Sequence, residues 1–399
     1  MSYERKLVSN LLTSLSKKLP VFQVLCGPRQ VGKTTIAKQV IEKIPFPSLY
    51  ATADSPYPLD YNWIETQFRL AEIEENKNKK PVLLILDEIQ KIKGWSEVIK
   101  FHWDDIKNSK KDIRLLILGS SSLLLQQGLS ESLAGRFFLN RCMHWSYTEM
   151  KEAFGLDLNK WVYFGGYPGS VIFIDDEEKW KRYIIDSLIE TVLVRDVLEM
   201  QKITKPILLR HLFSLSATFP AQVISYNKML GQLQDAGNTT TLASYLKLLE
   251  SAFLLSGLEL FSKGSVRKRG SSPKLIFWNN ALITALSMKR YQSALGDSIF
   301  WGRLIENAVG AHLLNNLHQP EFQITYWRDG NYEVDFVVIT GEDIWAIEVK
   351  SGRTGKLSGL ERFKEKYQKA KTIVIGTYGI PFETFFTTDP KLFFSKDLS

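Results

Sequence analysis

The feature that most constrains this chain is a glycine-bounded run near its start. The run reads Gly27-Pro28-Arg29-Gln30-Val31-Gly32-Lys33-Thr34. It matches the pattern G-x-x-x-x-G-K-[ST], in which bare backbone amides wrap a polyphosphate and the two glycines give it access. Lys33 can reach the β and γ phosphates, and the Thr34 hydroxyl can bind Mg²⁺. An apolar run before it (Val21–Cys26) predicts a buried strand, and helical spacing from Thr35 to Lys43 predicts a helix after it. The sequence therefore predicts an ATP site formed by residues 27–35.

A second apolar run, Val82–Leu86, ends in two carboxylates, Asp87 and Glu88. A central parallel strand that delivers charge to its carboxyl end has this pattern. The pair resembles a Walker B motif, in which Asp87 would hold magnesium, largely through water, and Glu88 would polarise the water that attacks the γ phosphate. The alternative is that the two acids cap a helix that follows a buried strand.

A third apolar run, within Arg114–Ser122, predicts another buried strand followed by small polar residues. Ser120 or Ser121 could sense the γ phosphate by hydrogen bonding. Arg136 precedes the expected last core strand, Phe137–Met143, and is a candidate arginine finger for the nucleotide of a neighbouring subunit. The alternative is a surface arginine without a role.

Five motifs occur in an order that carries a resemblance. They are the phosphate loop, Leu-Asp-Glu-Ile-Gln, Gly-Ser-Ser-Ser, Ser-Leu-Ala-Gly-Arg and Gly-Gly-Tyr-Pro at 165–168. This order resembles that of a large family of bacterial and archaeal AAA+-like ATPases, whose C-terminal domain is mostly without an assigned function. The resemblance implies an AAA-type core, binding of ATP with Mg²⁺, and self-association.

Length and charge set wider limits. With 399 residues the chain exceeds one ordinary core, and we expect domains at 1–155, 156–272 and 273–399. The formal net charge of +8 favours acidic partners such as nucleic acid. The two cysteines, Cys26 and Cys142, lie in apolar runs and predict buried thiols in a reducing compartment. No run approaches the roughly 18 apolar residues of a membrane span, so we expect a cytoplasmic protein without membrane contact.

The segment from Ile224 to Arg269 predicts a winged helix. A helix, a turn at Ala236–Asn238 and a second helix capped by Thr239–Thr241 precede the basic stretch Lys263–Arg269. That stretch could meet a DNA backbone. Winged helices in ATPases also serve as packing modules, and no base-reading set of side chains decides between the two hypotheses.

The last third of the chain contains a second candidate site. A hairpin is expected within Tyr326–Ile339 and a strand at Ile344–Lys350. Glu306, Asp335, Glu348 and Lys350 resemble the PD-(D/E)xK nuclease constellation, without its leading proline. In that chemistry carboxylates hold Mg²⁺ and the lysine orients the attacking water. The alternative is an exposed pair between Glu348 and Lys350.

The prediction is an α/β protein with a P-loop AAA-type core on a parallel sheet. A helical or winged-helix module and a C-terminal α/β domain like that of restriction endonucleases are expected to follow. We expect a magnesium-dependent ATPase that is oligomeric and associated with DNA. Two alternatives stay open, an ATP-gated metal-dependent DNA endonuclease and a nucleotide-controlled switch that binds a protein partner.

Overall fold

A computed structural model describes residues 3–109, 111–120, 129, 132–198, 203, 205–233, 238–262, 271–352 and 357–394, with backbone alone at 120, 195, 196 and 198. The chain forms two compact units. The first comprises Met1–Met143 and Arg195–Met200, and the second comprises His144–Val194 and Gln201–Ser399. The predicted domain boundaries at 155 and 272 remain a prediction.

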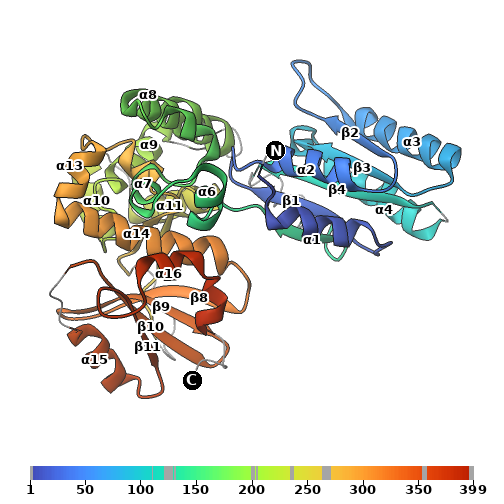
Figure 1. Ribbon diagram of the computed structural model, residues 1–399. Helices are drawn as coiled ribbons and strands as arrows, with labels where there is room; N and C mark the ends of the chain where they lie inside the picture. Colours follow the sequence, from blue (N-terminus) through green and yellow to red (C-terminus); the bar gives the residue numbers. More distant parts are fainter. Residues whose placement is uncertain are drawn as a thin grey trace. The chain divides into compact units, whose positions relative to one another are not determined.

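The first unit is built on a five-stranded parallel sheet with the order β2-β3-β4-β1-β5 (Figure 1). The strands are β1 (Phe22–Gly27), β2 (Ser48–Thr52), β3 (Val82–Asp87), β4 (Ile113–Ser120) and β5 (Phe137–Arg141). The helices are α1 (Lys6–Leu15), α2 (Lys33–Lys43), α3 (Tyr61–Asn78) and α4 (Trp95–Asn108). Strands β1 and β3 are buried throughout because helices cover both faces of the sheet. The predicted parallel α/β core is confirmed.

The register of this sheet brings three strand ends together. Strand β4 lies between β1 and β3, with Gly27 beside Ser120 and Leu118 beside Asp87. Because all three strands run in the same direction, the turn that leaves β1 and the acidic end of β3 share one edge of the sheet. This edge is where ligands bind in open α/β folds.

The second unit begins with a helical part. It contains α6 (Tyr147–Phe154), α7 (Leu158–Phe164), a 3₁₀ turn (Pro168–Phe173), α8 (Glu177–Arg182), two π-helical segments (Tyr183–Ile189, Val192–Leu198), α9 (Pro206–Ser216), α10 (Tyr226–Leu233) and α11 (Thr239–Ser251). An antiparallel pair, β6 (Leu255–Leu258) and β7 (Lys274–Phe277), follows.

The predicted cap of the second helix in this part is wrong by one residue. Asn238, not a threonine, caps α11, since its side chain accepts a hydrogen bond of 2.7 Å from the Thr241 amide. An amide oxygen at this position satisfies one of the unpaired donors of the first turn. Most of the predicted turn and the basic stretch Lys263–Arg269 lie outside the described residues.

The chain ends in a four-stranded mixed sheet with the order β11-β10-β9-β8. Its strands are β8 (Phe322–Asp329), β9 (Tyr332–Thr340), β10 (Asp343–Lys350) and β11 (Lys371–Gly376), of which only β10 and β11 pair in parallel. The helices here are α12 (Ala281–Thr284), α13 (Tyr291–Gly296), α14 (Ser298–Asn316), α15 (Ser358–Lys366) and α16 (Phe382–Thr387), with a 3₁₀ turn at Pro390–Phe394. The hairpin and the strand expected from the sequence are confirmed.

Buried apolar side chains form a separate core within each unit. Cys26 and Cys142 are buried and are not joined by a disulfide, and burial raises the pKa of the Cys26 thiol. Among the helices that the structure describes, none combines the length and apolar character needed to cross a membrane.

Candidate functional site

The phosphate loop connects β1 to α2. Its two glycines, Gly27 and Gly32, are each required by the backbone for a different reason. Gly32 has φ of +92°, a left-handed conformation that glycine adopts without strain. A Cβ on Gly27 would lie 1.9 Å from the carbonyl oxygen of Cys142. The backbone that follows β5 therefore leaves no room for a side chain at residue 27. Access of a phosphate at Gly27 stays a prediction.

Lys33 is folded into the loop that precedes it. Its ammonium donates hydrogen bonds to the carbonyl oxygens of Gly27, at 2.9 Å, and Pro28, at 2.7 Å. The side chain is buried at the first position of α2, where the helix dipole favours an anion. Thr34 and Thr35 follow on the same turn and are exposed.

The loop is also held from outside by an arginine that no motif contains. The Arg5 guanidinium is buried, and its Nη1 atom donates to the carbonyl oxygens of Val31, at 3.3 Å, and Met143, at 3.1 Å. Arg5 thereby ties the middle of the loop to the chain beyond β5. Sequence analysis missed it because Arg5 precedes the first strand and carries no recognisable pattern.

Asp87 lies next to the start of α2, as magnesium coordination requires. The Thr34 hydroxyl donates to Asp87 Oδ2 at 3.2 Å, and the Tyr50 hydroxyl donates to the same oxygen at 2.6 Å. A hydroxyl beside a buried carboxylate is a donor set that Mg²⁺ takes in nucleotide sites, so these residues fit the ion. Burial, followed by the Asp87 carboxylate, raises the pKa of Tyr50, which keeps its hydroxyl a donor. Tyr50 was missed because it lies on the neighbouring strand β2.

Glu88 turns away from regular strand geometry immediately after Asp87. Its backbone is left-handed, with φ of +54°, and its Oε2 atom accepts a hydrogen bond of 2.5 Å from Gln90 Nε2. Burial raises the pKa of Glu88, while the Lys33 ammonium opposes this shift. The alternative of a helix cap holds for position alone. Glu88 directly precedes the 3₁₀ turn at Ile89–Lys91, but its side chain makes no capping hydrogen bond to that turn.

Arg136 and Ser120 were also predicted to belong to this site, and the structure describes the side chain of Arg136 alone. Arg136 pairs with Asp104 of α4 through Nε–Oδ1 at 2.8 Å and Nη2–Oδ2 at 2.9 Å. This bidentate pair holds its guanidinium within its own unit, half-buried. Ser120 ends β4, but its side chain and the whole of Ser121 lie outside the described residues.

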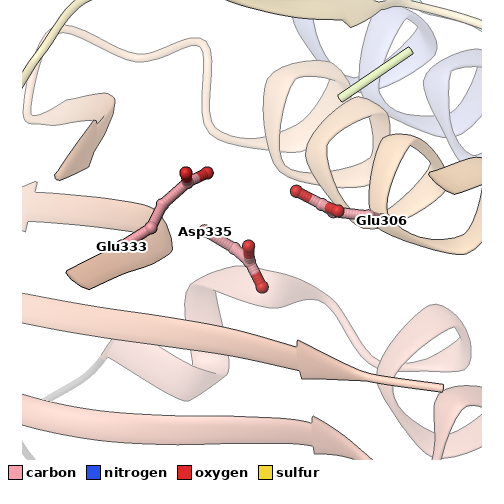
Figure 2. Close-up of side chains that lie close together, drawn as sticks. All are labelled: Glu306, Glu333 and Asp335. Atoms are coloured by element: carbon pink, nitrogen blue, oxygen red, sulfur yellow. The ribbon is translucent and has the colours of Figure 1, made fainter. Parts of the chain in front are cut away.

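The second candidate site is an acidic cluster at the C-terminal sheet (Figure 2). Glu306 of α14 and Glu333 and Asp335 of β9 each place a carboxylate oxygen within 4.8 Å of the others. Asp335 Oδ2 also accepts a hydrogen bond of 2.8 Å from the Val349 amide of β10. Glu333 was missed, because the nuclease pattern contains Asp335 and not the residue two positions before it.

Glu348 and Lys350 form a pair of their own. Lys350 Nζ donates to Glu348 Oε1 at 2.6 Å, and Glu348 is only 8 % exposed. The alternative of an exposed pair is therefore wrong. Burial, followed by the Asp335 carboxylate, raises the pKa of Glu348 to about 7.

A lysine that the sequence analysis did not single out lies inside the acidic cluster. Lys274, the first residue of β7, is fully buried. Its Nζ atom lies 2.6 Å from Glu306 Oε1, 3.3 Å from Glu333 Oε1 and 3.3 Å from Asp335 Oδ1. With an ammonium group among them, Glu306, Glu333 and Asp335 do not fit a divalent metal. Thr34 and Asp87 of the first unit do fit one. The only sequence signal was a charged residue beginning an otherwise apolar strand.

Family comparisons divide the chain into three matched regions. Residues 21–151 match a family described as an AAA domain. Residues 155–293 and 301–384 match two domains of unknown function, DUF8612 and DUF4143. The first match supports an AAA-like ATP-binding region, and the other two give no activity.

Two relatives that match most of this chain are described only as uncharacterized proteins. MJ1544 of Methanocaldococcus jannaschii is 26% identical over 370 residues, which cover 87% of this chain and 78% of the relative. Rv2008c of Mycobacterium tuberculosis is 26% identical over 368 residues, covering 90% and 76%.

Solved structures that this chain matches include the Walker-type ATPase PABY2304 of Pyrococcus abyssi. It has a TM-score of 0.47 and 14% identity, and the match covers 71% of this chain and 95% of that one. The RuvB Holliday junction branch migration motor of Thermotoga maritima has a TM-score of 0.34 and 15% identity, covering 67% and 92%. Among the matched regions, residues 21–151 are thus the part with a described family, and that family is an AAA domain.

Proposed function

We propose that this protein binds ATP together with Mg²⁺ at residues 27–35 and hydrolyses it. The observation that carries the proposal is the 3.2 Å hydrogen bond between the hydroxyl of Thr34 and the carboxylate of Asp87. This contact joins the end of the phosphate loop to the acidic end of β3, two segments that are far apart in the sequence. A nucleotide site of this kind needs both at the ion.

Each residue then has a role that follows from its position. Thr34 and Asp87 would hold Mg²⁺, which offsets the charge of the phosphates when it is bound. Lys33 would exchange its two carbonyl partners for phosphate oxygens, since an ammonium binds these as a point charge. Glu88 would orient a water molecule, and the raised pKa of its carboxyl favours accepting a proton. The backbone N–H groups of residues 29–33 would surround the phosphates, since Pro28 has no N–H to offer.

Binding is tested by replacing the loop lysine. We expect Lys33→Ala to weaken binding of a fluorescent ATP analogue by at least about 100-fold, because a charge-assisted contact to the phosphates is lost. Lys38→Ala is the matched control, since Lys38 is an exposed lysine of the same helix, and it should leave the affinity unchanged. Equal affinity of Lys33→Ala and the wild type would refute the proposal.

The proposal extends to self-association and to DNA. Self-association would let Arg136 leave Asp104 and contact the nucleotide of a neighbouring subunit, as an arginine finger does. DNA association is supported by the net charge of +8 and by the succession of α10, α11 and the β6–β7 pair, which has the outline of a winged helix. The three-part division at residues 155 and 272 belongs to the same proposal.

DNA association has its own test. We expect fluorescence anisotropy with labelled duplex DNA to show binding whose affinity falls steeply as salt is raised, because contacts to phosphates release counterions. Binding that is absent at low salt would remove this part of the proposal and leave the ATP site unaffected.

A further inference from the structure

We propose that the acidic cluster of the C-terminal sheet is a metal-free site, in which the ammonium of Lys274 takes the place of the divalent cation of the nuclease constellation. The cluster is defined here as Glu306, Glu333 and Asp335 (Figure 2). The proposal goes beyond ATP binding, because it concerns the other compact unit and none of the residues of the phosphate loop.

Lys274 occupies the space that an ion would need. Its Nζ atom contacts one oxygen of each acid in the cluster, at 2.6, 3.3 and 3.3 Å. The shortest contact, to Glu306 Oε1, is an ion pair rather than a well-angled hydrogen bond. A magnesium ion requires oxygens at about 2.0–2.1 Å on all sides, so it cannot share these ligands with an ammonium group. One cation excludes the other.

The remaining oxygens of the two central acids also have partners. Glu306 Oε2 accepts from Arg303 Nη1 at 3.0 Å, and Asp335 Oδ2 accepts from the Val349 amide at 2.8 Å. Glu348 Oε2 is a buried acceptor without a hydrogen-bond partner among the described residues. This oxygen by itself does not provide the several ligands that a divalent ion takes from a protein.

Lys274 is fixed in this position by its strand. It pairs with Leu258 across β6 and β7, its side chain is fully buried, and its ammonium lies 5.1 Å from the centre of the Phe336 ring. Burial alone would lower the pKa of Lys274, but the carboxylates of Glu306, Asp335 and Glu333 raise it further than burial lowers it. The lysine therefore stays charged. Its ammonium remains beside the three carboxylates because a buried charge without a partner is costly.

The consequence is chemical. A PD-(D/E)xK nuclease depends on its ion to acidify a water molecule and to stabilise the phosphate that is attacked. With Lys274 among the three acids, the cluster supplies a buried cation whose ammonium already contacts one oxygen of each acid. We infer that this unit retains a nuclease-like arrangement of acids without metal-dependent cleavage of nucleic acid.

Metal binding decides the proposal. The probe is Mn²⁺ without nucleotide, measured by the electron paramagnetic resonance signal of the free ion, and every protein carries Asp87→Asn to remove the metal ligand of the phosphate loop. With Lys274 present, we expect no bound Mn²⁺ that depends on Asp335. Lys274→Met should gain about one Mn²⁺ per chain, because three acids then lack a cation. Adding Asp335→Asn to Lys274→Met should abolish that gain.

The matched control is Lys289→Met. Lys289 also pairs with an acid of this unit, Asp297, but its side chain is 42% exposed, so its loss should create no Mn²⁺ site. Binding of Mn²⁺ in the protein with Lys274, if Asp335→Asn removed it, would overturn the proposal. A folded Lys274→Met variant that gains no Mn²⁺ would also overturn it.

A nicking assay keeps the proposal testable if Lys274→Met does not fold. We expect supercoiled DNA with Mg²⁺ to be nicked no faster by the wild type than by Asp335→Asn. A nicking rate that Asp335→Asn lowers at least about tenfold would contradict a metal-free site. Neither assay depends on ATP binding, so a failed proposal for the phosphate loop remains distinguishable from a failed proposal here.

Discussion

Among single side chains, His312 of α14 shows how burial sets a pH response. It is 5% exposed, and its ring centroid lies 5.2 Å from that of Phe385 and 5.5 Å from that of Phe386. Burial lowers the pKa of His312 to about 4. The imidazole is therefore neutral in the folded protein at pH values at which an unfolded chain already binds a proton.

The sign of the effect on stability follows from proton binding. Between the unfolded pKa of about 6.5 and the folded pKa, the unfolded state binds more protons, so the free energy of unfolding falls as the pH is lowered through this window. We expect His312 to lower the free energy of unfolding of the second unit by up to about 3 kcal/mol between pH 7 and pH 4. His312→Gln should remove this share of the loss.

Urea unfolding at several pH values between 7 and 4 measures the prediction. His211→Gln is the matched control, since His211 lies on α9 of the same unit and is exposed. It should keep the pH dependence of the wild type. If His312→Gln showed the same dependence as the wild type, burial of His312 would not be its source.

Among the helices, α14 carries Glu306, and a glycine determines how closely it approaches the sheet. A Cβ on Gly310 would lie 2.8 Å from Phe336 Cε1 and 2.9 Å from Ile276 Cγ2. Both neighbours are fully buried, so neither can move away at little cost. The absence of a side chain at Gly310 is what lets Glu306 reach Lys274 of β7.

We expect Gly310→Ala to lower the free energy of unfolding by about 1–3 kcal/mol, because the added methyl group overpacks a filled core. Gly231→Ala is the matched control. Gly231 is an exposed helical glycine of the same unit with no atom within 4 Å of its Cβ position. It should stabilise the protein by about 0.5–1 kcal/mol through the higher helix propensity of alanine. Urea unfolding of both variants tests this, and a neutral Gly310→Ala would argue against a tight contact.

For the molecule as a whole, the main functional question is whether one subunit completes the site of another. If Arg136 acts on a neighbouring nucleotide, Arg136→Ala and Glu88→Gln should each lose most ATP turnover, and an equimolar mixture should regain part of it. In the mixture, a subunit with intact Glu88 can lie beside one with intact Arg136. A stimulation of about tenfold over either variant alone is expected, since finger residues contribute factors of that size or larger.

The control for mixing is the double variant Glu88→Gln/Arg136→Ala. Combined with Arg136→Ala, it supplies no intact Arg136 and should restore nothing. Turnover of the first mixture that equals the mean of its two components would show that Arg136 does not act between subunits. Its bidentate pair with Asp104 would then be a structural contact within the subunit.

The sequence by itself determined the parallel core and the position of the phosphate loop between a strand and a helix. Apolar runs such as Val82–Leu86 report burial of one strand on both faces, and the glycine pattern at 27–34 reports a backbone geometry. Both signals lie within a single stretch of chain. For the core, the parallel pairing of β1, β3 and β4 agrees with the sequence pattern.

Only the tertiary structure decided which side chains meet. Tyr50 reaches Asp87 from a neighbouring strand, and Arg5 reaches Val31 from the residue before α1. Lys274 reaches the acids of the C-terminal cluster from β7. Such contacts depend on strand register and on helix packing, which bring together residues without any shared spacing in the sequence. The four nuclease-like residues could thus be found as a pattern. The buried ammonium of Lys274 among Glu306, Glu333 and Asp335 could not, because the distance between β7 and α14 is set by packing.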